Sequence, residues 1–329
     1  MAKELDKIWC PFAPAINQFA IIADRNTLEW AQRFNLLARD DRYGHARPIE
    51  YGWLAARAYP NSGWAELQIA ADWISWLFLM DDECDETGVG RDPRLLGQLH
   101  DRMIAILRGA EPIADDQPLA RALHDLRGRM AERASPAWLE RFTSAVEDYF
   151  VANRWEANNR LLGITPSLAT YQIKRAHTGA VFACFELLTI TDGIDLPPAV
   201  RDSAVVQGLT LLANCVICWC NDILSVNKEH KHGDVHNLVI VLQNERRLSN
   251  DAAMSETVQV HNDTVQAFLD LEKKLPSFGP EVDAEVARYI DSLRHWMRAN
   301  LDWSWTALRY ERLVQARPGE HPFALPQVL

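Results

Sequence analysis

The sequence predicts an all-α fold, and two observations carry the prediction. Short clusters of turn-forming residues divide much of the chain into segments of helical length. No stretch shows the sustained alternation of apolar and polar residues, enriched in Val and Ile, that is typical of half-buried β-strands. We therefore expect a bundle of helices without a sheet.

The expected turns are rich in Gly, Pro, Ser and Asn, which interrupt helices and favour turns. They lie at residues 61–63, 88–90, 109–112, 135–136, 163–166, 193–198 and 276–280. Ser135-Pro136 and Thr165-Pro166 are each typical of a helix start, because a hydroxyl can cap the first turn and Pro fits the first helical position. We expect one helix to begin at each pair.

The length of 329 residues allows one large domain or two ordinary ones, and a hydrophobic content of 48% is ample for a large core. The sequence shows no internal repeat, low-complexity linker or break in composition that would divide it. The simplest interpretation is a single helical domain that spans residues 1–329.

The segment 203–221 contains no charged residue and is about as long as a membrane-spanning helix. Its polar residues Gln207 and Asn214, and the Asn221-Asp222 pair that follows, are unfavourable in lipid. A helix that is apolar all round can equally be the central helix of a large bundle. We predict such a central helix and no membrane span.

The formal net charge of -11 argues against nucleic acid as a partner, because nucleic-acid binding depends on basic surfaces. A polyanionic ligand would instead have to be held through metal ions. The first residues show no basic segment followed by an apolar one, as an export signal would. We therefore expect a cytoplasmic protein.

Residues 81–86, Asp-Asp-Glu-Cys-Asp-Glu, follow directly on an apolar stretch at 73–80. On a helix, Asp81 and Asp85 are one turn apart, as are Asp82 and Glu86, so carboxylates point the same way. Such carboxylates repel each other unless a cation neutralises them, and oxygen ligands in small number suit Mg2+. Taken alone, the run is equally typical of a solvated acidic helix end.

A second motif follows the uncharged segment. Asn221, Ser225 and Glu229 have the spacing i, i+4, i+8, which places an amide oxygen, a hydroxyl and a carboxylate on one helical stripe. All three groups can be oxygen ligands of one metal ion, although the spacing is also common on solvated polar faces. Because both motifs end apolar elements, we expect them to face each other across one cavity.

The two motifs together resemble those of the bacterial class I terpene synthases. Residues 81–86 look like the DDxxDE motif of this family, and Asn221, Ser225 and Glu229 look like its NSE triad, with Lys228 as the basic residue of the motif. With the two motifs described next, the resemblance extends over nearly the whole chain. Four motifs in the same order and at matching intervals are more specific than any one of them alone.

Two further motifs carry the resemblance. Arg175 lies 46 residues before Asn221 and looks like the diphosphate-sensing arginine of the family, with Thr178 and Gly179 at the linker and effector positions. Arg309 and Tyr310 look like the Arg-Tyr pair that grips the diphosphate near the C-terminus.

The resemblance implies the α-helical terpenoid synthase fold and three Mg2+ ions. Asp81 would hold two ions, and Asn221, Ser225 and Glu229 the third. Whether Asp85 or Glu86 contacts metal is left open, because Glu83-Cys84 stands where many family members have an aromatic residue or His.

The resemblance also implies how the diphosphate is bound. Asp82 would pair with Arg309 on closure, and Arg175 would relay diphosphate binding through Thr178 to Gly179. An allylic diphosphate ionises when cations stabilise its leaving group, so for the substrate that the resemblance implies we expect a clamp of metal ions, Arg175, Lys228, Arg309 and the Tyr310 hydroxyl.

Ionisation leaves a carbocation, which must be kept from water and which aromatic faces can stabilise. Phe78 lies one helical turn before Asp81, and Trp303 lies six residues before Arg309. We expect both rings to line the wall beneath the metals. Four other aromatic residues are interpreted as ordinary core: Trp73, Trp76, Phe182 and Trp305.

The expected reaction is the conversion of a prenyl diphosphate, taken to be farnesyl diphosphate, into a sesquiterpene. Geranylgeranyl diphosphate is an alternative substrate. A chain-elongating prenyltransferase would show a second aspartate-rich motif, which the second half of the chain lacks, and a non-catalytic binding protein would not need intact ligands in both motifs. The resemblance leaves a homodimer open and does not fix the product.

Overall fold

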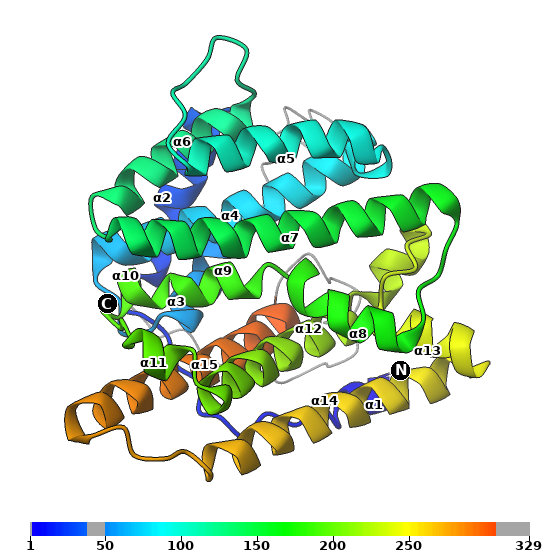
Figure 1. Cartoon of the computed structure of the whole chain (residues 1–329). Coiled ribbons are helices and arrows are strands. Elements are labelled where there is room, and N and C mark those ends of the chain that lie inside the picture. Colours follow the sequence, from blue (N-terminus) through cyan, green and yellow to red (C-terminus); the bar gives the residue numbers. More distant parts are fainter. Residues whose placement is uncertain (1, 38–49, 307–329) are drawn as a thin grey trace, which may run out of the picture.

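The computed structural model of the chain describes residues 2–37 and 50–306. Within these two ranges the regular elements are helices, and no β-strand occurs. The all-α prediction is confirmed, and the helices pack in layers around the long helices α4, α7 and α12 (Figure 1).

The elements in chain order are α1 (Ala2–Leu5), α2 (Ala20–Arg33), α3 (Tyr51–Ala58), α4 (Trp64–Thr87), the 3-10 helix η1 (Val89–Arg91), α5 (Pro93–Leu107), α6 (Pro118–Ala131), α7 (Pro136–Leu162), α8 (Leu168–Thr178), α9 (Val181–Glu186), α10 (Leu188–Thr191), α11 (Pro198–Arg201), α12 (Ala204–His232), α13 (Leu238–Arg246), α14 (Asn250–Glu272) and α15 (Pro280–Thr306). Each expected turn contains a helix end, a helix start or a link between helices.

One of the two predicted helix starts is correct and the other is wrong by two residues. Ser135 caps α7, with its hydroxyl accepting a hydrogen bond from the Trp138 N–H at 3.2 Å. The next helix begins after Ser167 and not at Thr165-Pro166. The helix begins there because the N–H groups of its first turn find acceptors. The Ser167 hydroxyl accepts from Thr170 N, and the carboxylate of Glu245 on α13 accepts from Leu168 N.

Helix α12 is the centre of the fold, packed against α14 and α15 over most of its length (Figure 1). Among the helices of residues 2–37 and 50–306 it is the one whose length and apolar character would allow a membrane span, but 72% of its most apolar window is buried inside the protein. The buried apolar residues of the described ranges form one continuous core. This agrees with the predicted central helix, whereas the single-domain extent of residues 1–329 stays a prediction.

Helix α4, which carries the acidic motif at its C-terminal end, is fixed by a buried carboxylate. Asp72 accepts hydrogen bonds from the Thr27 hydroxyl of α2 and the Gln68 amide, each at 2.8 Å. Its other oxygen lies 2.8 Å from the Arg129 guanidinium of α6. The network joins α2, α4 and α6, and loss of Asp72 would leave buried donors without an acceptor.

The rings of Trp73 and Trp76 add to this anchorage. They stack at 5.3 Å between centroids, and both side chains are fully buried. The interpretation of these two residues as core is confirmed.

We expect Asp72→Ala to destabilise the fold by about 2–3 kcal/mol, because it leaves the Thr27 and Gln68 donors without their acceptor, while Arg129 keeps its ion pair with Asp125. Denaturant unfolding of the variant would measure the loss. Asp101→Ala is the matched control, since Asp101 is a mostly exposed carboxylate paired with Arg154 on the surface and should cost less than about 1 kcal/mol. Equal losses in the two variants would show that the Asp72 network does not anchor α4.

Candidate active site

A cavity of about 1250 Å3 lies between α3, α4, α7, α8, α9, α12 and α15. Its apolar wall includes Leu54, Ile74, Phe78, Val181, Ile217 and Trp296. Its polar lining comes largely from the C-terminal ends of α4 and α12 and from α7 and α8. A large cavity with an apolar wall and a charged rim is suited to a ligand with a hydrocarbon part and an anionic part.

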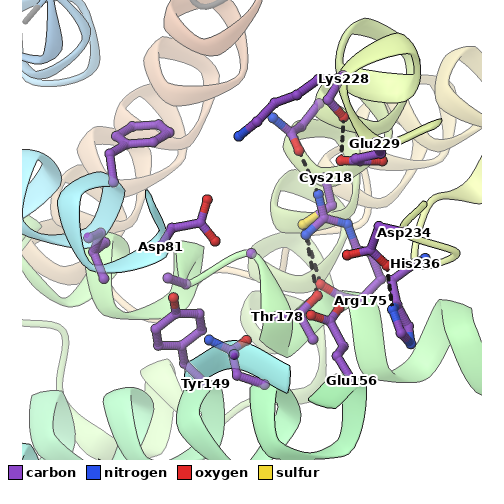
Figure 2. Close-up of a pocket in the computed structure, with 18 of the residues that line it drawn as sticks. Asp81, Tyr149, Glu156, Arg175, Thr178, Cys218, Lys228, Glu229, Asp234 and His236 are labelled. Atoms are coloured by element: carbon purple, nitrogen blue, oxygen red, sulfur yellow. Dashed lines mark hydrogen bonds and ion pairs between the residues drawn. The ribbon is translucent and has the colours of Figure 1, made fainter. Parts of the chain in front are cut away.

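The acidic motif reaches the cavity through Asp81, whose carboxylate points into the space across from Arg175 and Glu229 (Figure 2). Asp82 lies 3.9 Å from the Lys228 ammonium, so an ion pair already links the ends of α4 and α12. The side chains of residues 83–87 lie outside the described part of the structure, and with them the expectations for Asp85 and Glu86.

All three triad residues line the same cavity, as the helical spacing predicted. The Ser225 hydroxyl donates to Glu229 Oε1 at 2.7 Å, and the side-chain amide of Asn237 donates to Glu229 Oε2. Asn221 Oδ1 accepts from the Arg175 guanidinium at 2.8 Å. The triad residues therefore lie together on one stripe of α12 at the cavity, and Figure 2 shows Glu229 across the cavity from Asp81 of α4.

Glu229 supplies the carboxylate of this stripe. Burial and the nearby negative charge of Asp222 raise the pKa of Glu229 to about 8. No group of three or more His, Cys, Asp or Glu side chains in the described residues could hold a metal ion, so a metal site here would need the neutral oxygens of Asn221 and Ser225. Hard oxygen donors with one carboxylate fit Mg2+, which is usually completed by water and substrate oxygens.

Arg175 on α8 is buried, with 9% of its surface exposed, and still lines the cavity. Its Nε donates to Asp222 Oδ1 at 2.8 Å, Nη2 donates to Asn221 at 2.8 Å, and Nη1 donates to the Thr178 hydroxyl at 3.3 Å. Burial alone would lower the pKa of Arg175, but the Asp222 carboxylate outweighs it and the pKa lies well above its ordinary value. The site therefore holds a permanent, oriented cation.

Asp222 was not recognised from the sequence as a site residue. It is completely buried and accepts from the Tyr171 hydroxyl at 2.7 Å and from the Leu238 N–H at 2.9 Å, in addition to Arg175. These bonds tie α8 and α13 to α12. The available signal was a charged residue that ends an otherwise uncharged helical run, eight residues after Asn214.

Asn214, Cys218 and Asp222 lie seven residues before the three triad residues, on the same side of α12, and we call them the anchoring stripe. The Asn214 amide donates to the Ala176 carbonyl at 2.7 Å, and the Cys218 thiol is 3.5 Å from the Arg175 carbonyl. The anchoring stripe thus holds the last turns of α8, while the neighbouring triad stripe faces the cavity.

Gly179 lies where α8 ends, and the following residue, Ala180, has a left-handed backbone with φ of +56°. A Cβ atom on Gly179 would come within 2.7 Å of Cys218 Sγ, which is closer than side chains tolerate. Glycine is therefore required for α8 to approach α12 this closely. Thr178 and Gly179 both line the cavity beside Arg175.

A charged group on α7 was also missed by sequence reasoning. Glu156, Arg160 and Asp234 line the cavity, and Arg160 Nη1 lies 2.7 Å from Asp234 and 3.9 Å from Glu156. Burial raises the pKa of Glu156. No pattern in the sequence joins α7 to the loop after α12, so only the fold brings these charges together.

Phe78 and Trp303 lie together, but only Phe78 is among the residues that line the cavity. The Phe78 ring stacks on Tyr51 at 4.4 Å and lies 5.3 Å from the Trp303 ring. Trp303 is 2% exposed and donates its indole N–H to the Glu50 carbonyl at 2.8 Å. Trp303 therefore supports Phe78 from behind, and Arg309 and Tyr310 lie outside the described residues.

Comparison with known proteins matches residues 72–267 to the family model described as terpene synthase family 2, C-terminal metal binding. The chain is 48% identical to a (+)-T-muurolol synthase of Roseiflexus castenholzii, described as (2E,6E)-farnesyl diphosphate cyclizing, with 91% of this chain and 92% of the relative covered. It is 38% identical to a germacrene A synthase of Nostoc punctiforme, over 93% and 95% of the two chains.

Solved structures of similar proteins have the same fold. Germacradien-4-ol synthase from Streptomyces citricolor superposes with a TM-score of 0.79 at 26% identity, covering 90% of this chain and 97% of that one. An α-eudesmol synthase, at 22% identity and a TM-score of 0.82, covers 91% and 98% and shows the fold alone.

The cavity, the facing motifs and these similarities agree, and the matched region belongs to a metal-binding family. The chain belongs to the terpene synthase family and is a class I terpene synthase.

Proposed function

We propose that this enzyme uses Mg2+ to ionise farnesyl diphosphate, cyclises the resulting carbocation to a sesquiterpene and releases diphosphate. The observation that carries the proposal is the cavity of about 1250 Å3, at which Asp81, the triad stripe and Arg175 converge above an apolar wall. The relative at 48% identity, which cyclises farnesyl diphosphate, supports the choice of substrate. Geranylgeranyl diphosphate is the alternative substrate.

Two sets of oxygens would hold three Mg2+ ions. We assign Asp81 and Asp85 to two ions on the α4 side, and Asn221, Ser225 and Glu229 to the third on the α12 side. Bound there, the ions would act as Lewis acids that stabilise the negative charge developing on the diphosphate. The position of Asn221, Ser225 and Glu229 at the same cavity as Asp81 supports the assignment.

The protein's own cations complete the diphosphate site. Arg175 and Lys228 line the cavity from α8 and α12 and would donate hydrogen bonds to diphosphate oxygens. Arg309 and Tyr310 are assigned to the same role by family resemblance. Asp82, which lies beside Lys228 in the structure, would pair with Arg309 on closure.

Thr178 and Gly179 are assigned to the relay between diphosphate and hydrocarbon. Thr178 accepts a hydrogen bond from Arg175, and Gly179 is the next residue at the cavity wall. A movement of the Arg175 side chain towards diphosphate would therefore change its contact with Thr178 and so displace the turn between α8 and α9.

The hydrocarbon chain would lie against the apolar wall. Phe78 offers its ring to the cavity, where an aromatic face can stabilise a passing carbocation, and Trp303 fixes the orientation of that ring. The enclosing side chains of Ile74, Val181 and Ile217 would keep water from the cation. The cytoplasmic location and a homodimeric state stay predictions.

The direct test is to incubate the purified protein with Mg2+ and, separately, geranyl, farnesyl and geranylgeranyl diphosphates, and to analyse the products by mass spectrometry. We expect a fifteen-carbon terpene from farnesyl diphosphate and none when EDTA removes the metal. Product formed only when isopentenyl diphosphate is added would indicate a prenyltransferase. No turnover of any substrate would indicate a non-catalytic binding protein.

Asp81→Ala and Asn221→Ala should each lower kcat by about 100-fold or more, because each removes an oxygen from a metal site that stabilises the leaving group. Steady-state release of diphosphate measures the effect. Asp101→Ala and Asn244→Ala remove exposed side chains of the same types from α5 and α13 and should leave kcat within about twofold. Turnover that survives in both site variants would remove these residues from the proposed metal sites.

A further inference from the structure

The three side-chain acceptors of Arg175 differ in charge and in hydrogen-bond distance. Asp222 is charged, completely buried and held by Tyr171 and Leu238, so its bond to Nε is a fixed anchor. Thr178 is a neutral acceptor at the longer distance of 3.3 Å. Asn221 is a neutral acceptor at 2.8 Å, and it is also the first member of the triad.

Asn221 Oδ1 therefore has two possible positively charged partners, the Arg175 guanidinium and a metal ion at the triad. An amide oxygen has two lone pairs, but a guanidinium N–H and a divalent ion on the same oxygen would lie only a few ångströms apart and repel each other. The oxygen that serves as a metal ligand binds the ion best when the Nη2 group of Arg175 has turned away. The two uses of Asn221 compete.

The geometry lets Arg175 turn without losing its charge partner. Only Nε is bonded to the charged acceptor Asp222, whereas Nη1 and Nη2 have the neutral partners Thr178 and Asn221. The guanidinium can exchange its neutral acceptors for diphosphate oxygens while Asp222 continues to hold Nε. Asp222 and Tyr171 thus act as positioning residues.

We propose that Asn221 couples the metal site to the diphosphate site: its hydrogen bond restrains Arg175 from the diphosphate, and a divalent cation on the triad releases that restraint. The proposal rests on the proposed diphosphate-binding function. By thermodynamic reciprocity, the same hydrogen bond weakens metal binding at the triad until Arg175 has found another acceptor.

The test removes the shared acceptor and measures binding without metal. Isothermal titration calorimetry with inorganic diphosphate in EDTA should show Asn221→Ala binding about 2- to 10-fold more tightly than the unmodified enzyme, the range expected for one released hydrogen bond. Asn221→Leu, which keeps the volume of the side chain but has no acceptor, should behave alike. Circular dichroism checks that both variants are folded.

Ser225→Ala is the matched control, because Ser225 belongs to the same triad but bonds to Glu229 and not to Arg175. It should leave the affinity for metal-free diphosphate within twofold of the unmodified enzyme. With Mg2+ present, the Asn221 variants and Ser225→Ala should all bind diphosphate more weakly than the unmodified enzyme.

Unchanged or weaker metal-free binding in both Asn221 variants would overturn the coupling. An equal gain in Ser225→Ala would also overturn it, because the gain would then follow from general loosening of the triad. Failure of the unmodified enzyme to bind diphosphate even with Mg2+ would instead contradict the proposed function, so the two ideas fail by different results.

Discussion

The buried ion pair between Arg175 and Asp222 is the contact on which the rest of the site depends. Arg175 is 9% exposed and Asp222 is completely buried, so each offsets the cost of burying the other's charge, with the Tyr171 hydroxyl as a further donor to Asp222. Because Arg175 lies on α8 and Asp222 on α12, their ion pair fixes the relative position of the two helices. The same ion pair places a cation at the cavity wall, where an anionic leaving group would lie.

Helix α12 serves two purposes with two adjacent stripes. The anchoring stripe, Asn214, Cys218 and Asp222, holds α8 through side chain to backbone and side chain to side chain bonds. The triad stripe, Asn221, Ser225 and Glu229, follows seven residues later on the same side of the helix and lines the cavity. With α14 and α15 covering the rest, little of α12 is left for water, which explains its uncharged run in a helix that is 72% buried over its most apolar window.

The sequence predicted what depends on local spacing and missed what depends on packing between distant segments. The helices and the central apolar helix follow from helical periodicity, and the facing of Asp81 towards the triad was expected because both motifs end apolar elements. The start of α8 was placed two residues early because Glu245, 77 residues away, satisfies an N–H group of its first turn. Asp222 and the Arg160–Asp234 pair belong to no spacing pattern, and Trp303 lies behind Phe78 because Tyr51 and Glu50 hold its ring there.

The central claim is that the ends of α4 and α12 hold divalent ions on either side of one diphosphate that Arg175 contacts. Crystals grown with Mn2+ and inorganic diphosphate test it directly, since anomalous scattering locates each ion without reference to activity. The account predicts ions on Asp81 and on the oxygens of Asn221, Ser225 and Glu229, with diphosphate between them and within hydrogen-bond distance of Arg175. Ions absent from both motifs, or diphosphate bound away from Arg175, would contradict it.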